Sequence, residues 1–180
     1  MRNGLAWICC LILGWMALAA PARAQQDKSK RPSPPAQATF TFPDGKTITM
    51  DYSSPRMRGR KIYGGLVPYG QVWRTGANEA TTFVTTADLD VGGTTVPAGS
   101  YTIFSIPEEG KWTLIISKTT GEWGTKYSGA ADDLARIPMK SSSLPSPVED
   151  FLIAFEKTGN GCVLHFDWEK TRASVRISEK

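Results

Sequence analysis

The segment from Trp73 to Thr81, WRTGANEAT, gathers side chains that can bind and orient a ligand. Within six positions it carries a cation, Arg74, an amide, Asn78, and a carboxylate, Glu79. The planar guanidinium of arginine binds carboxylate or phosphate groups through two parallel hydrogen bonds. We therefore expect a polar pocket in which Arg74 holds an anionic group while Asn78 and Glu79 orient it.

The same side chains also suit a structural role. Arg74 and Glu79 can pair with each other, or with backbone carbonyls, and fix a long loop on the domain. Two aromatic side chains, Trp73 and Tyr69, lie beside the polar residues. They complete the candidate ligand-binding set, for which the sequence indicates neither a catalytic residue nor a metal.

Aromatic side chains outside the expected strands suggest a second ligand chemistry, the stacking of sugar rings. They are Tyr63, Tyr69, Trp73, Trp123 and Tyr127. A glycosidase would also need two carboxylates, and Glu79 with Glu122 or Asp167 is a possible pair. The alternative function is therefore an envelope hydrolase that acts on a glycan or ester, with Glu79 as the acid/base, paired with another acid or with His165.

Other chemical signatures are weak. The basic run from Arg56 to Lys61 lacks the spacing of a phosphate-binding loop, and a solvated surface or a contact with an anionic polymer or lipid explains it. His165 is the single histidine, and with Asp167 it lies on the strand face opposite Leu164 and Phe166. This pair is too small for a zinc site, and we expect no cofactor.

The first 24 residues have the features of a signal peptide. Arg2 precedes an apolar run over residues 5–20, and Ala22-Arg23-Ala24 forms a cleavage site of the small-x-small type. The apolar run is too short for a comfortable membrane span. We expect cleavage after Ala24, a periplasmic or secreted protein, and no permanent membrane span.

Removal of this leader changes the charge and the cysteine content. Two of the 21 basic residues and none of the 17 acidic ones leave, which gives a net charge of +2. Such a balance, in an exported protein, offers no reason to expect a nucleic-acid partner. Cys162 is the one remaining cysteine, so no intramolecular disulfide can form, and we expect a buried, unreactive thiol.

The rest of the chain reads as a spacer followed by one domain. Residues 25–37 hold three prolines and no large apolar side chain, which predicts a disordered tether. Residues 38–180 have the length of a single domain. Alternating apolar and polar residues, interrupted every 8 to 12 positions by turn residues, predict an all-β antiparallel sandwich or a jelly-roll-like fold.

The expected strands are short. A Ser/Pro-rich link over residues 141–147 should separate two of them, and the last two should form a hairpin about residues 170–172. Residues 119–134 should form a long loop with one helical turn near Ala130. The expected strands are 38–42, 46–52, 81–86, 88–91, 94–96, 101–106, 112–118, 135–140, 151–157, 162–169 and 173–178.

The block over residues 54–81, with its core GRKIYGGLVPYG followed by VWRTGANEAT, resembles the bacterial domain of unknown function 2911 family. The pieces VPAGSY, WTLII and WEKTR, at residues 96–101, 112–116 and 168–172, also resemble it. The resemblance implies an exported domain and implies no particular activity. We expect a binding or structural module of the cell envelope, whose partner is a small ligand, a glycan or another envelope component.

Overall fold

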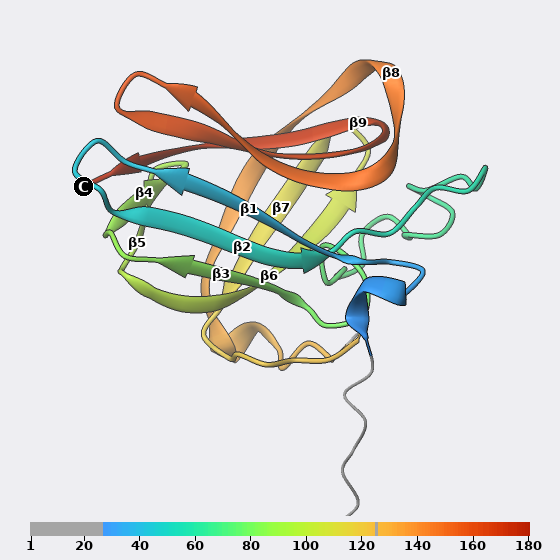
Figure 1. Cartoon of the computed structure of the whole chain (residues 1–180), viewed down its shortest axis with the longest axis horizontal. Coiled ribbons are helices and arrows are strands. Elements are labelled where there is room, and N and C mark those ends of the chain that lie inside the picture. The colour runs from blue at the N-terminus through green and yellow to red at the C-terminus, as the bar shows by residue number, and fades with distance from the viewer. Residues whose placement is uncertain (1–26, 125) are drawn as a thin grey trace, which may run out of the picture.

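Nine β-strands form where the sequence alternates between apolar and polar residues. A computed structural model describes residues 27–124 and 126–180 (Figure 1). The expected signal peptide lies outside these residues. The prediction of an all-β, single-domain protein is confirmed. The strands are β1 (Pro35–Thr41), β2 (Thr47–Ser53), β3 (Thr81–Thr85), β4 (Leu89–Val91), β5 (Thr94–Val96), β6 (Gly99–Glu108), β7 (Lys111–Ser117), β8 (Asp133–Thr158) and β9 (Gly161–Glu179).

The strands form one antiparallel sheet that folds around a single main core. Their order is β1-β2-β3-β6-β7-β8-β9-β4-β5. The two edge strands, β1 and β5, both lie against β8, so the sheet curves back on itself. Figure 1 shows the ribbon of β8 and β9 turning over β1. Side chains from all nine strands meet in the enclosed core.

Strands β8 and β9 are longer than the sequence predicts. The expected break over residues 141–147 is wrong, because β8 continues through it with two register shifts. The expected hairpin about residues 170–172 is also wrong, because Thr171 and Arg172 pair with Ser143 and Ser142 of β8. Both strands bend in this region, and Glu169 takes a positive φ of 53°. The bends bring the far half of the ribbon over the core.

Two 3₁₀ turns flank the sheet within the described residues. η2 (Ala130–Asp132) lies where a helical turn was expected, and η1 (Lys28–Lys30) precedes β1. Residues 27–34 pack against the domain and β1 starts at Pro35, which differs from the expectation of a disordered tether up to residue 37. No described helix is long and apolar enough to cross a membrane.

Candidate functional site

The loop over residues 54–80, hereafter the long loop, is fastened to the sheet by backbone hydrogen bonds. The N–H of Met57 donates to the carbonyl of Glu149 at 2.8 Å, beside the bend of β8. Trp73 exchanges two bonds of 2.8 Å with Ser105 of β6. These contacts hold the loop at one end of the molecule, at the right of Figure 1.

The turn that follows Trp73 carries a strained backbone. Thr75 and Asn78 take positive φ angles of 53° and 56°, in the region that favours glycine. At Gly76, where φ is +154°, a Cβ atom would lie 3.0 Å from the carbonyl oxygen of Ser53. Buried hydrogen bonds from the Thr81 hydroxyl to the Thr75 carbonyl and from Thr75 to Ser105 fix this path. The turn sets the direction of Arg74.

An aromatic cluster supports the inner side of the long loop. The rings of Trp73 and Trp168 stack at 5.9 Å, and Phe151 meets Trp73 edge-on at 5.0 Å. Tyr63 contacts Trp112 at 4.9 Å. The indole N–H of Trp73 donates to the carbonyl of its own turn at 3.1 Å. Most of the Trp73 ring therefore serves the core.

Arg74 lines a cavity of about 340 Å³, hereafter the Arg74 cavity. Its Nε is buried and has no hydrogen-bond partner among the described residues. No described carboxylate lies within 4.0 Å of its guanidinium. Burial lowers the pKa of Arg74 below its ordinary value. A half-buried cation without a counter-charge is costly, and an anionic ligand would supply the missing partner.

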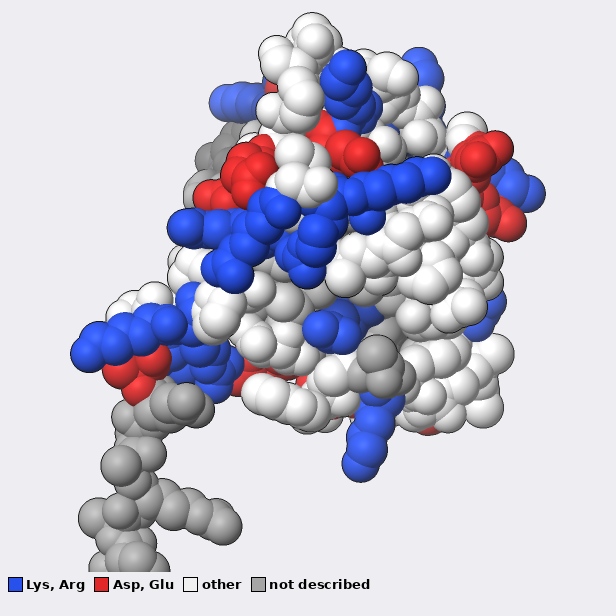
Figure 2. All heavy atoms as spheres, turned by 90° about the vertical axis from the view of Figure 1, so that its right-hand side faces the viewer, with Lys and Arg blue, Asp and Glu red and all other residues white. Residues whose placement is uncertain are grey.

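The rest of the cavity wall is cationic and apolar. Arg60 contributes a second guanidinium, which donates to the carbonyls of Met57 and Arg56 and to no carboxylate among the described residues. Leu66, Val67, Pro68 and Trp168 supply apolar surface. Lys and Arg side chains form a band across this end of the molecule in Figure 2. The local charge favours an anion with an apolar body.

Glu79 and Asn78 contact the N-terminal segment instead. Arg31 donates to both carboxylate oxygens of Glu79, at 3.0 and 2.9 Å, and Lys28 lies 3.0 Å away. The amide of Asn78 donates to the carbonyl of Ser33 at 3.0 Å. Because Ser33 lines the Arg74 cavity, these two side chains help to position part of its wall.

The environment of Glu79 suits an ion pair better than acid/base work. Burial would raise its pKa, but hydrogen bonds from its own backbone and from Arg31 and Lys28 outweigh burial and lower the pKa from 4.5 to about 2. Its hydrogen-bond and ion-pair partners among the described residues include neither a second acid nor His165. The expected pairing of Glu79 with Arg74 is not formed either.

Tyr69 does not line the Arg74 cavity. The residue is 39% exposed, and its ring packs against Gly64, where a Cβ atom would lie 2.8 Å from Cε2 of Tyr69. It lines a second cavity of about 360 Å³ together with Tyr63. The five candidate residues are thus divided between two cavities and the contact with the N-terminal segment.

His165 and Asp167 occupy the predicted strand face, but they are 7% and 3% exposed. Arg172 forms two hydrogen bonds with Asp167, at 2.8 and 2.6 Å. The Nδ1 of His165 lies 3.3 Å from this carboxylate, out of line for a hydrogen bond. No group of three or more metal-ligating side chains occurs in the described residues. Cys162 is buried, and burial raises the pKa of its thiol to about 12.

A family model described as protein of unknown function (DUF2911) matches residues 33–177. The chain belongs to this family. The match begins at Ser33 in the N-terminal segment and covers the long loop, both cavities and the bends of β8 and β9. No curated protein and no solved structure matches the chain. The function of this DUF2911 domain must therefore be argued from its own geometry.

Two arginines beside the candidate site of this DUF2911 domain take part in contacts that the sequence does not predict. Arg60 is exposed, as the prediction of a solvated or anion-contacting basic run requires, but its place in the lining of the Arg74 cavity was not predicted. Arg31 was assigned to a disordered spacer, although it binds Glu79 across 48 positions and lies 6.0 Å from the ring of Trp123. The clustering of Arg56, Arg58 and Arg60 before the glycine-rich turn is visible in the sequence, but nothing there points to Arg31 as the partner of Glu79.

Proposed function

We propose that this DUF2911 domain is a binding module of the bacterial cell envelope whose Arg74 cavity holds the anionic group of a small ligand. The buried Nε of Arg74, which has no partner among the described residues, carries this proposal. The cavity volume of about 340 Å³ falls within the range of small-molecule sites. A carboxylate or phosphate would accept two parallel hydrogen bonds from the guanidinium.

The side chains of the cavity wall further restrict the chemistry of the ligand. Leu66, Val67 and Pro68 would contact an apolar or ring-shaped body, while Arg60 adds positive charge near the Arg74 end. A small organic acid or a phosphate ester fits this combination better than a free inorganic ion. Both ligand classes share the chemistry that Arg74 recognises.

The envelope location rests on the leader sequence, with its basic residue, apolar run and cleavage site before Gln25. Export would place the cavity in the periplasm or outside the cell. The alternative function, a hydrolase with Glu79 as the acid/base, gains less support. A carboxylate whose pKa is about 2 and which is paired with two cations is a poor proton donor near neutral pH.

Ligand binding can be followed through tryptophan fluorescence, because Trp73 and Trp168 both line the Arg74 cavity. Phenylacetate and phenyl phosphate are titrated into the full chain, with benzyl alcohol as the neutral analogue. We expect the two anions to bind more tightly than the alcohol. Arg74→Met should weaken their binding about tenfold or more, as the loss of a charge-assisted pair would.

The matched control is Arg176→Met, which removes an exposed arginine of β9 close to the C-terminus. It should leave the affinity unchanged. Equal binding of the anions by wild type and Arg74→Met, or no preference for anions over the alcohol, would refute the proposed function.

A further inference from the structure

The second cavity, hereafter the Tyr63 cavity, differs in chemistry from the Arg74 cavity. It lies between the long loop, the β6–β7 turn and the bend of β8 and β9, and its volume is about 360 Å³. Its lining contains two tyrosines, two glutamates and four hydroxyl-bearing side chains, and no cation. An anionic ligand would be repelled here.

Tyr63 lines this cavity, and its hydroxyl has no hydrogen-bond partner within residues 27–124 and 126–180. The side chain is 3% exposed, and its hydroxyl is buried without a hydrogen bond to any described residue. Such a group costs about 1 to 3 kcal/mol of stability unless something satisfies it. Burial, and then the charges of Glu169 and Asp167, raise the pKa of Tyr63 well above its ordinary value, so the hydroxyl remains a donor.

The surrounding groups supply the matching acceptors and donors. Glu109 is exposed beside Glu108, and Glu109 has no ion pair among the described residues. The hydroxyls of Ser141, Ser142 and Ser143 on β8 have no hydrogen-bond partner there either. Carboxylates accept hydrogen bonds, whereas serine hydroxyls both donate and accept. Together they could satisfy several hydroxyl groups that point in different directions.

Tyr69 supplies an aromatic platform at the edge of this cavity. Its ring is held by contact with Gly64, whose φ of +74° and missing Cβ atom leave room for it. A partly exposed tyrosine ring buries apolar C–H surface while its polar end stays in water. A flat ring with apolar faces and hydroxyl edges would match both the platform and the polar lining.

We propose that the Tyr63 cavity binds a neutral, hydroxyl-rich ring of the kind found in sugars, with Tyr69 stacked on its face and Tyr63 bonded to one of its hydroxyl groups. The proposal rests on a different cavity and different side chains from the Arg74 site. It therefore stands whether or not the Arg74 cavity binds an anion.

The test titrates the full chain with glucose, mannose, galactose, N-acetylglucosamine and their short oligosaccharides by isothermal titration calorimetry. We expect at least one of these saccharides to bind. Tyr69→Ala should weaken that binding about tenfold or more through the loss of stacking. Tyr63→Phe should weaken it about three- to tenfold through the loss of one hydrogen bond.

Three controls make the result specific. Tyr63→Phe should unfold at the same or a higher denaturant concentration than wild type, because it removes a buried hydroxyl that has no partner. Tyr127→Phe removes a tyrosine hydroxyl that binds Asp133, and it should leave saccharide affinity unchanged. Arg74→Met should also leave it unchanged, which separates this proposal from the anion site.

Two results would overturn the proposal. They are no binding of any saccharide in the panel up to tens of millimolar, and binding that both Tyr69→Ala and Tyr63→Phe leave intact.

Discussion

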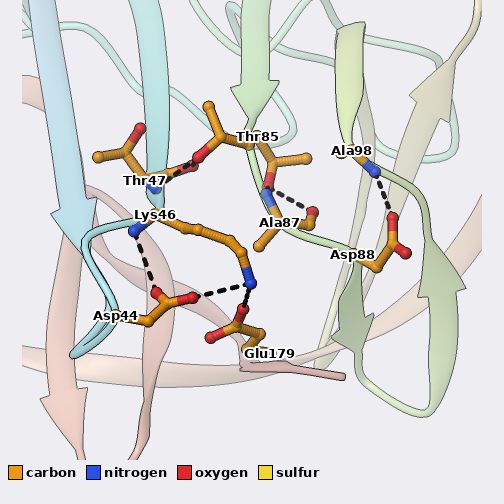
Figure 3. Close-up of polar contacts among 9 residues, drawn as sticks. Asp44, Lys46, Thr47, Thr85, Ala87, Asp88, Ala98 and Glu179 are labelled. Carbon is orange, nitrogen blue, oxygen red and sulfur yellow. Dashed lines mark hydrogen bonds and ion pairs between the residues drawn. The ribbon is translucent and has the colours of Figure 1, made fainter.

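The turns at residues 43–46 and 85–87 differ from the long loop in how the polar side chains named below are paired. At the β1–β2 turn, Asp44 accepts bonds from both the backbone and the side chain of Lys46, whose Nζ also binds Glu179 (Figure 3). The hydroxyl of Thr85 bonds twice to the backbone of Ala87. Within the long loop, Arg74 Nε and Tyr63 Oη are buried without partners among the described residues.

This difference separates groups that stabilise the fold from groups that are available to a ligand. A buried polar group with a good partner contributes to stability, whereas one without a partner lowers it. The two residues that carry these groups, Arg74 and Tyr63, each line a cavity of more than 300 Å³. Local strain at Thr75 and Asn78 occurs in the same loop. Unsatisfied and strained groups cluster at functional sites.

Removing a satisfied group should have the largest effect. Thr85→Val keeps the β-branched shape but deletes both bonds to Ala87, which is also buried. We expect a loss of about 1 to 3 kcal/mol in the free energy of unfolding, measured by denaturant titration. The control Thr41→Val changes an exposed side chain of β1 and should alter stability by less than about 0.5 kcal/mol. Equal effects of the two variants would show that the hydrogen bonds of the Thr85 hydroxyl contribute no more to stability than an exposed threonine hydroxyl does.

Glu79 is a charged residue of the long loop that, unlike Arg74, has ion-pair partners. Its carboxylate is paired with Arg31 and Lys28, yet its side chain is 36% exposed, so we expect Glu79→Gln to cost less than about 1 kcal/mol at neutral pH. Folding lowers the pKa of Glu79 from 4.5 to about 2, so its ion pairs contribute their full stabilisation to the native state above pH 4.5. This stabilisation is lost as the pH falls toward 2 and the carboxylate is protonated.

Denaturant titrations of wild type and Glu79→Gln across this pH range provide the measurement. The difference between the two proteins should be constant above pH 4.5 and should vanish near pH 2. Glu109→Gln is the matched control, since Glu109 is exposed and has no ion pair among the described residues. A difference that instead grew as the pH fell would show that the ion pairs do not stabilise the native state.

The sequence predicts those parts of the fold that depend on local pattern. Strand β2 and the turn at Gly45 follow from alternation and from a glycine with a φ of +90°. The continuity of β8 depends on pairing between Ser142 and Arg172, 30 positions apart, which no local pattern contains. Apolar side chains that recur at every second position therefore predict strands, but they do not predict where the long strands β8 and β9 bend.

The candidate site shows the same limit. The side-chain types at Arg74 and Glu79 indicate ion-pair chemistry, and the sequence spacing alone makes these two residues the natural partners. In the fold, Glu79 instead meets Arg31 from the segment before β1, so Arg74 is left beside a cavity. Charge pairing depends on which loops meet at one end of the sheet, and the one-dimensional sequence does not contain that information.

Arg74 should show the smallest stability effect, although it is half-buried in the long loop. Arg74→Met keeps much of the side-chain length and removes the positive charge. Because the buried Nε has no hydrogen-bond partner among the described residues, its removal leaves no other group there unpaired. We expect the free energy of unfolding to change by less than about 0.5 kcal/mol, or to rise, when the variant is compared with wild type by denaturant titration. A loss of about 3 to 5 kcal/mol would mean that the guanidinium neutralises a buried group, as a broken buried ion pair does. The guanidinium of Arg74 would then have a partner within the protein, as Lys46 does in the β1–β2 turn, and the main reason to expect a ligand in the Arg74 cavity would be gone.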